Sequence, residues 1–557
     1  MKRVGILLQS TNCSKQLYET VHELYECNQV EIFYLVNCQT PSQQGLWEKI
    51  KARIGTVRPN QILDKILFKS IIAAENRIMS RLSKSVREQN GLFNLDNFEG
   101  VKRISLKPIF SPSGIVVRYS DEDIDKIREL NLDIIIRGNA QRILKGKILN
   151  AAQEGIISFH HGDNRWNRGG PLGFWEVYLR KDYTGYTIQI LTEELDGGSV
   201  IFRGNVATKP TYAENVVELL NSSNPHLARL IVQYAQTGRL PEPEVQVPYG
   251  ASLLMTPTSL QSIAYLLKTL SIFLSLFVNK LLLRKRLRWN VAFVKSAWRY
   301  AILRKGIVIQ NPPGRFLADP FVIRKDERTI CYVEDYYYAS KRACVTAVEI
   351  FENNKYRILG PVIQEPFHLS FPYLFEYDDD LYMVPESLDS NSVRLYKCLE
   401  FPSKWLYVKD IMSEVRVVDT MIFKDDNRWW LLCNKALAED DKCGVMLMAY
   451  YSDDPLTDNW HAHQLNPLIV DDEIARNGGI LEVTSSHPVR VRQKQGFNLY
   501  GKGMSMASIT ELSPSSYAET EIAQIYPHFF KAISGCHHMH SDGQYTVYDY
   551  VKLERIT

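Results

Sequence analysis

The chain has 557 residues, which is too long for one compact core, and its balance of apolar and charged residues is that of a folded protein. Its 66 basic and 63 acidic residues nearly cancel, so no chain-wide field points to nucleic acid. The nine cysteines include no CxxC pair, which argues against a disulfide scaffold. The N-terminal apolar run is too short for a signal peptide, so we expect a cytoplasmic protein.

Before about residue 250, short apolar runs alternate with helix-like stretches. This alternation predicts βαβ units and a mostly parallel sheet in a domain of residues 1–248. Residues 45–100 are basic and helix-prone, and we interpret them as a helical insertion. The predicted strands are residues 4–8, 30–35, 132–136, 156–159 and 187–191.

The stretch from Gly155 to Val206 carries a chemical motif. The predicted strand 156–159 delivers His160 and His161 to a loop rich in Gly, Asn and Arg, and parallel sheets present functional side chains at such strand ends. A second strand leads into Leu-Asp-Gly-Gly, where Asp196 is the carboxylate. An imidazole and a carboxylate at two strand ends suit a general base and its orienting partner.

This stretch resembles the folate-dependent formyltransferase family, in which a strand ends in Asn-x-His and is followed by an Arg-Gly loop and a later Leu-Asp-x-Gly. The matching positions are His160, Arg168-Gly169 and Asp196. The resemblance covers roughly residues 1–210 and implies a Rossmann-like sheet and N10-formyltetrahydrofolate as the donor. Two positions differ from the family: Ser158 replaces its Asn, and residues 162–165 replace its Ser-Leu-Leu-Pro loop.

The resemblance also implies roles for individual residues. His160 would stabilise the oxyanion or relay a proton, and Asp196 would orient that histidine. With Ser158 in place of the amide, Asn139 or Asn164 is left to supply the missing donor. The expected catalytic residues are His160, Asp196, Ser158 and Asn139. The expected cofactor contacts are Arg137, Gly138, Asp196 and Gly197, and the expected substrate contacts are His161, Asp163, Asn164, Arg168, Gly169 and Trp175.

Residues 249–298 form a hydrophobic and basic linker, within which Leu260–Arg288 is predicted to be helical. Its longest uncharged stretch, Thr269–Asn279, is about half of the ~20 residues that a spanning helix requires. Two interpretations remain open: an interfacial helix that contacts lipid headgroups, or a helix packed between domains or against a partner subunit of a homo-oligomer. The basic cluster consists of Arg284, Lys285, Arg286 and Arg288.

After about residue 299 a loose repeat of short aromatic strands and Asp, Asn or Gly turns begins. Five copies at roughly 50-residue spacing predict a five-bladed β-propeller over residues 299–557, with a β-sandwich as the competing fold. The copies start at Ala318, Ser370, Val418, Ser486 and Ser534.

This half resembles the five-bladed domain at the N-terminus of plant glucosamine inositolphosphorylceramide transferases, through RFLADPFVI, HLSFPYLFE, YMVPES and FPSKW. More distantly it is similar to five-bladed glycoside hydrolases, which implies acids on innermost strands. Asp319, Asp419 and Glu482 are the candidates, either for glycosidic cleavage or for hydrogen bonds between blades. The run from Cys536 to His540 is interpreted as a strand with partly buried histidines, so no metal site is predicted.

Together these features predict an α/β Rossmann-like formyltransferase domain followed by an all-β five-bladed propeller. The expected activity is formyl transfer from N10-formyltetrahydrofolate to an amino sugar, on a sugar nucleotide or lipid-linked glycan, in surface-polysaccharide biosynthesis. The amino-sugar acceptor rests on analogy with the attached propeller. Two alternatives remain: a glycan-processing propeller beside a degenerate formyltransferase domain, and a glycan-binding or scaffolding protein without catalysis.

Overall fold

The chain forms two compact units, Met1–Ile272 and Phe273–Thr557. The expected linker of residues 249–298 is not a separate region, because its end forms β13 (Lys285–Val294), which pairs inside the second unit. The computed structural model describes residues 1–38, 59–89, 91–112, 114–140, 142–194, 197–245, 247–425, 427–435, 446–483 and 487–555.

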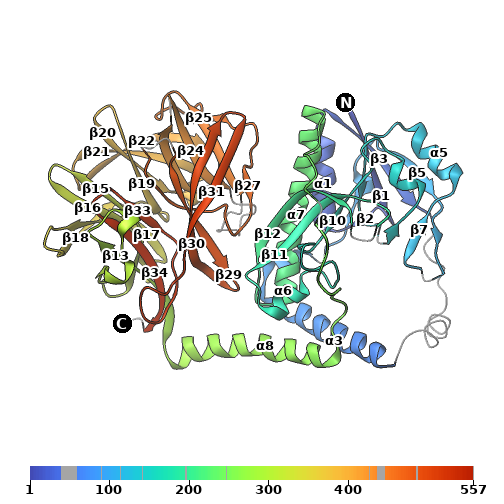
Figure 1. The fold of residues 1–557 in the computed structure, drawn as a ribbon, viewed down its shortest axis with the longest axis horizontal. Helices are drawn as coiled ribbons and strands as arrows, with labels where there is room; N and C mark the ends of the chain where they lie inside the picture. The colour runs from blue at the N-terminus through green and yellow to red at the C-terminus, as the bar shows by residue number, and fades with distance from the viewer. Residues whose placement is uncertain are drawn as a thin grey trace. The chain divides into compact units, whose positions relative to one another are not determined.

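A seven-stranded sheet forms the centre of the first unit (Figure 1). Four strand pairs, β1–β3, β1–β8, β3–β5 and β8–β10, are parallel, whereas β11 and β12 add antiparallel to one edge. The predicted α/β arrangement is therefore present in this half. In spatial order the strands are β12 (Ser199–Ala207), β11 (Tyr183–Ile190), β10 (Ile156–His160), β8 (Ile134–Arg137), β1 (Lys2–Leu8), β3 (Val30–Asn37) and β5 (Lys102–Leu106).

Both faces of this sheet are buried at its centre, which explains why β1, β8 and β10 are mostly apolar. Alternate residues of β1 point to opposite faces, so Ile6 belongs to one core cluster and Leu7 to the other. The first cluster is covered by α1 (Lys15–Glu26) and α7 (Tyr212–Thr237), and the second by α5 (Asp121–Glu129). Serine or threonine hydroxyls cap the first turn of all three helices.

The expected helical insertion of residues 45–100 is helical over part of its described length, and Phe93–Asn94 form the strand β4. It contains α3 (Pro59–Leu82) and α4 (Lys84–Gln89), and residues 45–58 lie outside the described residues. Met79 and Val86 pack against Ala213 and Val217 of α7, so the insertion is anchored to the same face as α1. Shorter strands complete this unit: β2 (Asn12–Cys13), β4 (Phe93–Asn94), β6 (Ile109–Phe110), β7 (Val116–Arg118) and β9 (Ile143–Leu144).

The helix α8 (Ser259–Phe277) continues as the π-helical turn η3 (Val278–Leu282). By length and composition, Ser259–Leu282 is the one described helix apolar enough to cross a membrane. This finding differs from the sequence argument, which counted only the uncharged residues Thr269–Asn279. Arg288 does not join the basic cluster after α8. It is buried in β13, where its guanidinium donates hydrogen bonds to the carbonyl oxygens of Pro312 and Arg315.

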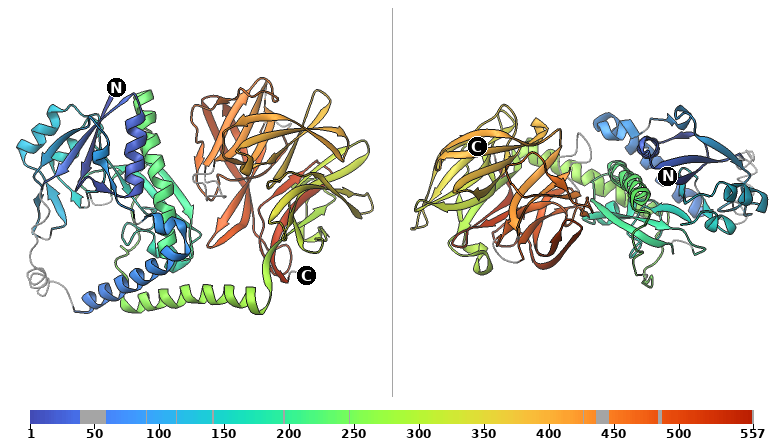
Figure 2. Two further views of the ribbon diagram at one scale, coloured as in Figure 1. Left: turned by 180° about the vertical axis from the view of Figure 1, so that it is seen from behind. Right: turned by 90° about the horizontal axis from the view of Figure 1, so that it is seen from above.

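The described residues of the second unit form five small sheets in succession (Figure 2). Its first sheet pairs β13 with the last strand, β34 (Thr546–Arg555), along the full length of both, so the two ends of this unit close in one sheet. That sheet also holds β14 (Ile307–Ile309), β32 (Ile533–Gly535) and β33 (Met539–Ser541). The next two are β15 (Arg315–Lys325), β16 (Arg328–Tyr337), β17 (Arg342–Ile350) and β18 (Tyr356–Ile363), then β19 (Ser370–Tyr377), β20 (Asp380–Glu386), β21 (Ser392–Glu400) and β22 (Lys404–Ser413).

The last two sheets repeat this pattern. One holds β23 (Val417–Asp425), β24 (Arg428–Lys435), β25 (Met446–Ser452), β26 (His461–Ala462) and β27 (Ile469–Val470), and the other holds β28 (Asn477–Leu481), β29 (Val489–Gly496), β30 (Leu499–Ser513) and β31 (Ser516–Ile525). The inner strands contact one another in the cyclic order β33, β15, β19, β23, β28 and back to β33. The all-β class of this half is thus observed, while the five-bladed propeller stays a prediction.

Four inner strands share a bulge at the same place in the repeat, which skips two residues in the pairing. Asp319 and Asp419 stand at this bulge with φ of 47° and 49°. In the fourth sheet the bulge is Gly478-Gly479, so the inner strand is β28, upstream of the repeat start that the sequence predicted at Ser486. That start was wrong: Ser486 lies outside the described residues, and the chain after it forms the second strand, β29.

Candidate functional sites

His160 ends β10 at the carboxyl edge of the parallel strands, as expected. Its Nε2 atom lies 3.1 Å from the carbonyl oxygen of Asn167, at the far end of the loop that follows the strand. The loop is itself closed by hydrogen bonds from the amides of Trp166 and Asn167 to the carbonyl oxygen of Asp163. The His160 ring is therefore oriented by a backbone carbonyl group. Its expected partner, Asp196, lies outside the described residues.

Ser158 and one of the two candidates for the missing amide, Asn139, are engaged elsewhere, whereas the other candidate, Asn164, lines the pocket described below. The Ser158 hydroxyl is buried, where it donates to the carbonyl oxygen of Phe159 and accepts from Arg137. The Asn139 side chain accepts from the amide of Gln9 at 2.7 Å and donates to two carbonyl oxygens of the loop after β1. Asn139 thus holds that loop, and the structure does not direct its amide to His160. Gly138, expected to contact the donor, packs tightly against the end of β1.

The sequence analysis missed a buried carboxyl group, that of Glu176, which lies near His160. Glu176 of α6 (Phe174–Leu179) is fully buried, and neither carboxyl oxygen has a hydrogen-bond partner among the described residues. Burial raises the pKa of Glu176 to about 7, against the opposing effect of nearby Lys181 and His160. The only sequence signal was a glutamate inside the apolar run FWEVYL.

Three expected substrate contacts have structural roles instead. The His161 ring stacks on Phe159, and burial lowers its pKa to about 4, so it stays neutral against α7. The Trp175 indole donates to the carbonyl oxygens of Gly170 and Met255, both at 3.2 Å. A Cβ atom added to Gly169 would lie 1.7 Å from the carbonyl oxygen of Leu254. Gly169 and Trp175 therefore hold the segment around residue 254.

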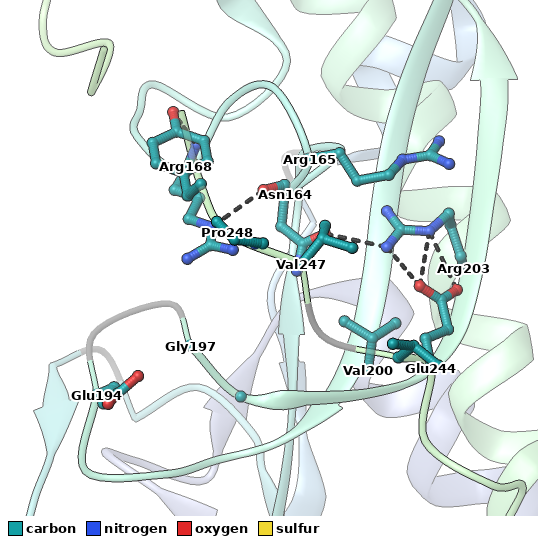
Figure 3. Close-up of a pocket in the computed structure, with 13 residues that line it drawn as sticks. Asn164, Arg165, Arg168, Glu194, Gly197, Val200, Arg203, Glu244, Val247 and Pro248 are labelled. Carbon is teal, nitrogen blue, oxygen red and sulfur yellow. Dashed lines mark hydrogen bonds and ion pairs between the residues drawn. The ribbon is translucent and has the colours of Figure 1, made fainter. Parts of the chain in front are cut away.

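The loop after His160 also lines a pocket of about 350 Å³ (Figure 3). Arg203 of β12 binds the carboxylates of Asp163 and Glu244 at 2.8 and 2.7 Å and the amide oxygen of Asn164 at 3.1 Å. The Arg168 guanidinium stacks over the Tyr249 ring at 4.6 Å. Arg203 and Glu244 were missed, since nothing in the motif pointed to β12 or to the segment after α7.

Glycines of the Leu-Asp-Gly-Gly motif line the other side of this pocket. Gly197 lies beside Glu194, opposite Asn164 and Arg168. Gly198 also lines the pocket. The structure thus brings together the predicted residues Asn164, Arg168 and Gly197, whereas His160 is not among the lining side chains. Of the three arginines that line the pocket, Arg165 and Arg203 are paired with carboxylates, whereas Arg168 donates to the carbonyl oxygen of Asn164. Among the described residues no ion pair joins Arg168 to a carboxylate, so its guanidinium is the charge that suits a phosphate or carboxylate on a ligand.

A second pocket, of about 370 Å³, lies among the inner strands of the all-β unit. It holds two of the three predicted acids, Asp319 and Asp419. The third prediction was wrong: the Glu482 carboxylate binds Arg299 at 2.7 Å and the Trp298 indole at 3.0 Å. Further polar residues of this axial pocket are Glu334, His368, Glu386, Arg476 and His537, and its aromatic residues are Trp289, Phe316, Tyr336 and Tyr500.

The carboxylates of the axial pocket differ in their environment. Asp419 is paired with Arg476 at 2.6 Å, and both side chains are buried. Burial raises the pKa of Glu386 to about 8, and the negative charge of Asp419 adds to this rise. Neutral and charged carboxyl groups therefore stand in one cavity, an arrangement typical of acid and base pairs.

His537 stands between two carboxylates. Its Nε2 atom lies 3.4 Å from Asp319 and its Nδ1 atom 2.8 Å from Asp549, while its ring stacks on Trp289 at 3.9 Å. One ligand atom from each of the three residues lies within 4.8 Å of the others, a spacing compatible with a metal, although each ring nitrogen already faces a carboxylate. His538 packs between Phe321 and Phe371, away from this group.

Comparisons with known proteins relate the two halves to different families. Residues 296–544 match the family described as glucosamine inositolphosphorylceramide transferase 1, N-terminal. The protein of that name from Arabidopsis thaliana is 30% identical over 213 residues, which are 38% of this chain and 28% of that protein. Methionyl-tRNA formyltransferase from Bacillus pumilus is 31% identical over 99 residues, 18% of this chain and 30% of that protein.

Among solved structures, glycinamide ribonucleotide transformylase 1 from Symbiobacterium toebii is 13% identical, with 46% of this chain and 94% of that one covered. Its TM-score of 0.25 supports no inference about fold or activity. The chain spans less than a third of the length of the two curated relatives named above. The relation of the second half to the plant N-terminal domain is confirmed, and the relation of the first half to formyltransferases is distant.

Proposed function

We propose that the chain is an N-formyltransferase that uses N10-formyltetrahydrofolate and acts on an amino sugar, carried by a sugar nucleotide or a lipid-linked glycan. One observation carries this proposal: a single loop runs from His160 to the wall of an arginine-lined pocket that Gly197 of the Leu-Asp-Gly-Gly motif also lines. The similarity to methionyl-tRNA formyltransferase supports the reaction type. We further propose that the enzyme acts in the cytoplasm during surface-polysaccharide assembly.

The proposed reaction moves one carbon between two nitrogens. The neutral amine attacks the formyl carbon, a C–N bond forms, and the tetrahedral oxyanion collapses as the bond to N10 of the folate breaks. The proton lost by the amine ends on N10. His160 would stabilise the oxyanion or carry this proton, and Asp196 would orient the ring. The arginines of the pocket would bind the anionic part of a ligand, a glutamate tail or a phosphate.

The all-β unit is proposed to be a five-bladed propeller whose axial pocket binds the glycan. The cyclic contacts of the inner strands support the propeller, and four aromatic side chains around buried carboxylates suit a sugar ring. A second function is favoured by the same pocket. Glycosidic cleavage needs one protonated and one ionised carboxyl group. Glu386, whose pKa is raised to about 8, suits the acid, and Asp419, paired with Arg476, suits the base.

Two variants separate these functions. Formyl transfer that is lost in His160→Ala and kept in Glu386→Gln would support the proposed transferase. Glycan cleavage that survives His160→Ala and disappears in Glu386→Gln would replace it with the second function. Both activities are measured on the full chain. Release of tetrahydrofolate reports formyl transfer, and release of reducing sugar reports glycan cleavage.

A further inference from the structure

Helix α8 packs against the first unit with its polar side. Ser262, Tyr265 and Thr269 are its buried residues, and the Tyr265 hydroxyl binds the Glu75 carboxylate of α3. The Lys268 ammonium donates to the carbonyl oxygen of Tyr178 at 2.9 Å. A core helix of a soluble protein buries its apolar stripe, so this orientation is the reverse of the usual one.

The opposite side of α8 is an exposed apolar stripe. Its residues recur every three or four positions along the helix. The first of them, Leu260, precedes the buried Ser262 by two residues, which places the two sets about 200° apart around the helix axis. Each of these side chains is between 44% and 80% exposed. The stripe consists of Leu260, Ile263, Leu267, Leu270, Leu274 and Phe277.

A basic segment continues from this stripe. Lys280, Arg284 and Arg286 are exposed, and Lys285 is partly exposed. There is no aspartate or glutamate between Glu244 and Asp319, so the segment contains no acidic residue to balance these charges. Among the described residues, no ion pair joins the four cations to a carboxylate elsewhere in the chain.

We propose that α8 lies flat in the interface of a membrane that contains anionic lipids, with the stripe among the acyl chains and the basic segment on the headgroups. An apolar face flanked by cations is the arrangement that binds such surfaces. The α8 stripe and the basic segment contain no acidic residue, so pairing of two stripes would not itself neutralise the cations. A spanning helix would have to break the bonds of Tyr265 and Lys268 to the first unit. The inference is independent of the reaction proposed above.

Flotation of the full chain with phospholipid vesicles tests this proposal. We expect binding to vesicles of phosphatidylcholine with 30% phosphatidylserine, weaker binding to phosphatidylcholine alone, and release by an alkaline carbonate wash. The double variant Leu267→Glu, Leu274→Glu should lose binding, and Arg284→Gln with Arg286→Gln should weaken it on the order of 20-fold. The controls are Leu406→Glu, an apolar residue exposed on β22, and Lys355→Gln, and both should bind as the wild type does.

Three results would overturn the proposal. One is absence of wild-type binding to the anionic vesicles, and another is retention after the carbonate wash, which would show a spanning helix. The third is a wild-type dimer in analytical ultracentrifugation that the Leu267→Glu, Leu274→Glu variant converts to a monomer while vesicle binding stays unchanged. Circular dichroism of each variant shows whether a loss of binding accompanies a loss of fold.

Discussion

The Nε2 atom of His160 lies 3.1 Å from the carbonyl oxygen of Asn167. Because a carbonyl can only accept, Nε2 carries a proton in this contact, and Nδ1 is the ring nitrogen left for a ligand. The same loop continues into Arg168 at the wall of the arginine-lined pocket. Ring orientation and pocket shape are therefore coupled through a few residues of backbone.

Replacing His160 by Ala should abolish most of the proposed activity. Removing one group that stabilises a developing oxyanion typically lowers kcat by about 100- to 1000-fold. Release of tetrahydrofolate from N10-formyltetrahydrofolate measures the effect. His461→Ala is the matched control, because His461 is exposed on the edge strand β26 of the other unit. Equal rates for both variants would exclude His160 from the reaction.

Glu176 should make stability depend on pH. Burial raises its pKa from 4.5 in the unfolded chain to about 7, so above pH 4.5 the unfolded state releases a proton that the folded state still holds. The buried carboxyl group therefore lowers the free energy of unfolding as pH rises from 4.5, by up to about 3 kcal/mol above pH 7. Glu176→Gln should be more stable than the wild type at pH 8 and similar at pH 4.5.

Urea unfolding at both pH values measures this difference. The control is Glu26→Gln, which removes an exposed carboxylate at the end of α1 and should give the same difference from wild type at both pH values. A Glu176→Gln variant that is less stable than the wild type at pH 8 would contradict this prediction, because it would show that the folded protein stabilises the ionised carboxylate.

Gly169→Ala should detach the segment around residue 254 from the pocket. The added methyl group would overlap the carbonyl oxygen of Leu254, and backbone cannot move aside as a side-chain end can. At the neighbouring Gly170 the nearest atom is 4.0 Å away, so Gly170→Ala is a matched control. Fluorescence of Trp175, which bonds to Met255 in this segment, should change in Gly169→Ala alone. Identical spectra would contradict the close packing.

Asp419→Asn should destabilise the all-β unit. The substitution takes away a buried carboxylate that binds Arg476 at 2.6 Å, and breaking such a pair typically costs about 3 kcal/mol or more. Asp453→Asn, at an exposed position in the loop after β25, is the control and should change stability by less than about 0.5 kcal/mol. Chemical unfolding followed by fluorescence gives both values. Equal losses of stability in the two variants would contradict a stabilising role for the ion pair between Asp419 and Arg476.

The elements that the sequence predicted are those with a strong local pattern. Residues 4–8 and 156–159 are continuous apolar runs because both faces of their sheet are covered, and the strand end at His160 follows from that. Asp319 and Asp419 were found because both stand near the start of a repeated motif, where the structure has the bulge of the inner strand. Such local regularity is visible without knowledge of distant contacts.

What the sequence did not predict depends on contacts between distant segments. Glu482 was chosen by spacing, but the glycine bulge of its sheet lies upstream, and Arg299 binds it instead. Glu386 ends a second strand and reaches the axial pocket only through the packing of neighbouring sheets. Asn139 carries a suitable amide, but the loop after β1 occupies it.

The most direct measurement of the central claim is a transfer assay with the purified full chain. The protein is incubated with N10-formyltetrahydrofolate and a panel of UDP- and dTDP-linked amino sugars, and both tetrahydrofolate and the formylated sugar are quantified. The account predicts equal amounts of the two products with at least one amino sugar, and their joint loss in His160→Ala. Absence of both products across the panel, with a folded protein, would contradict it.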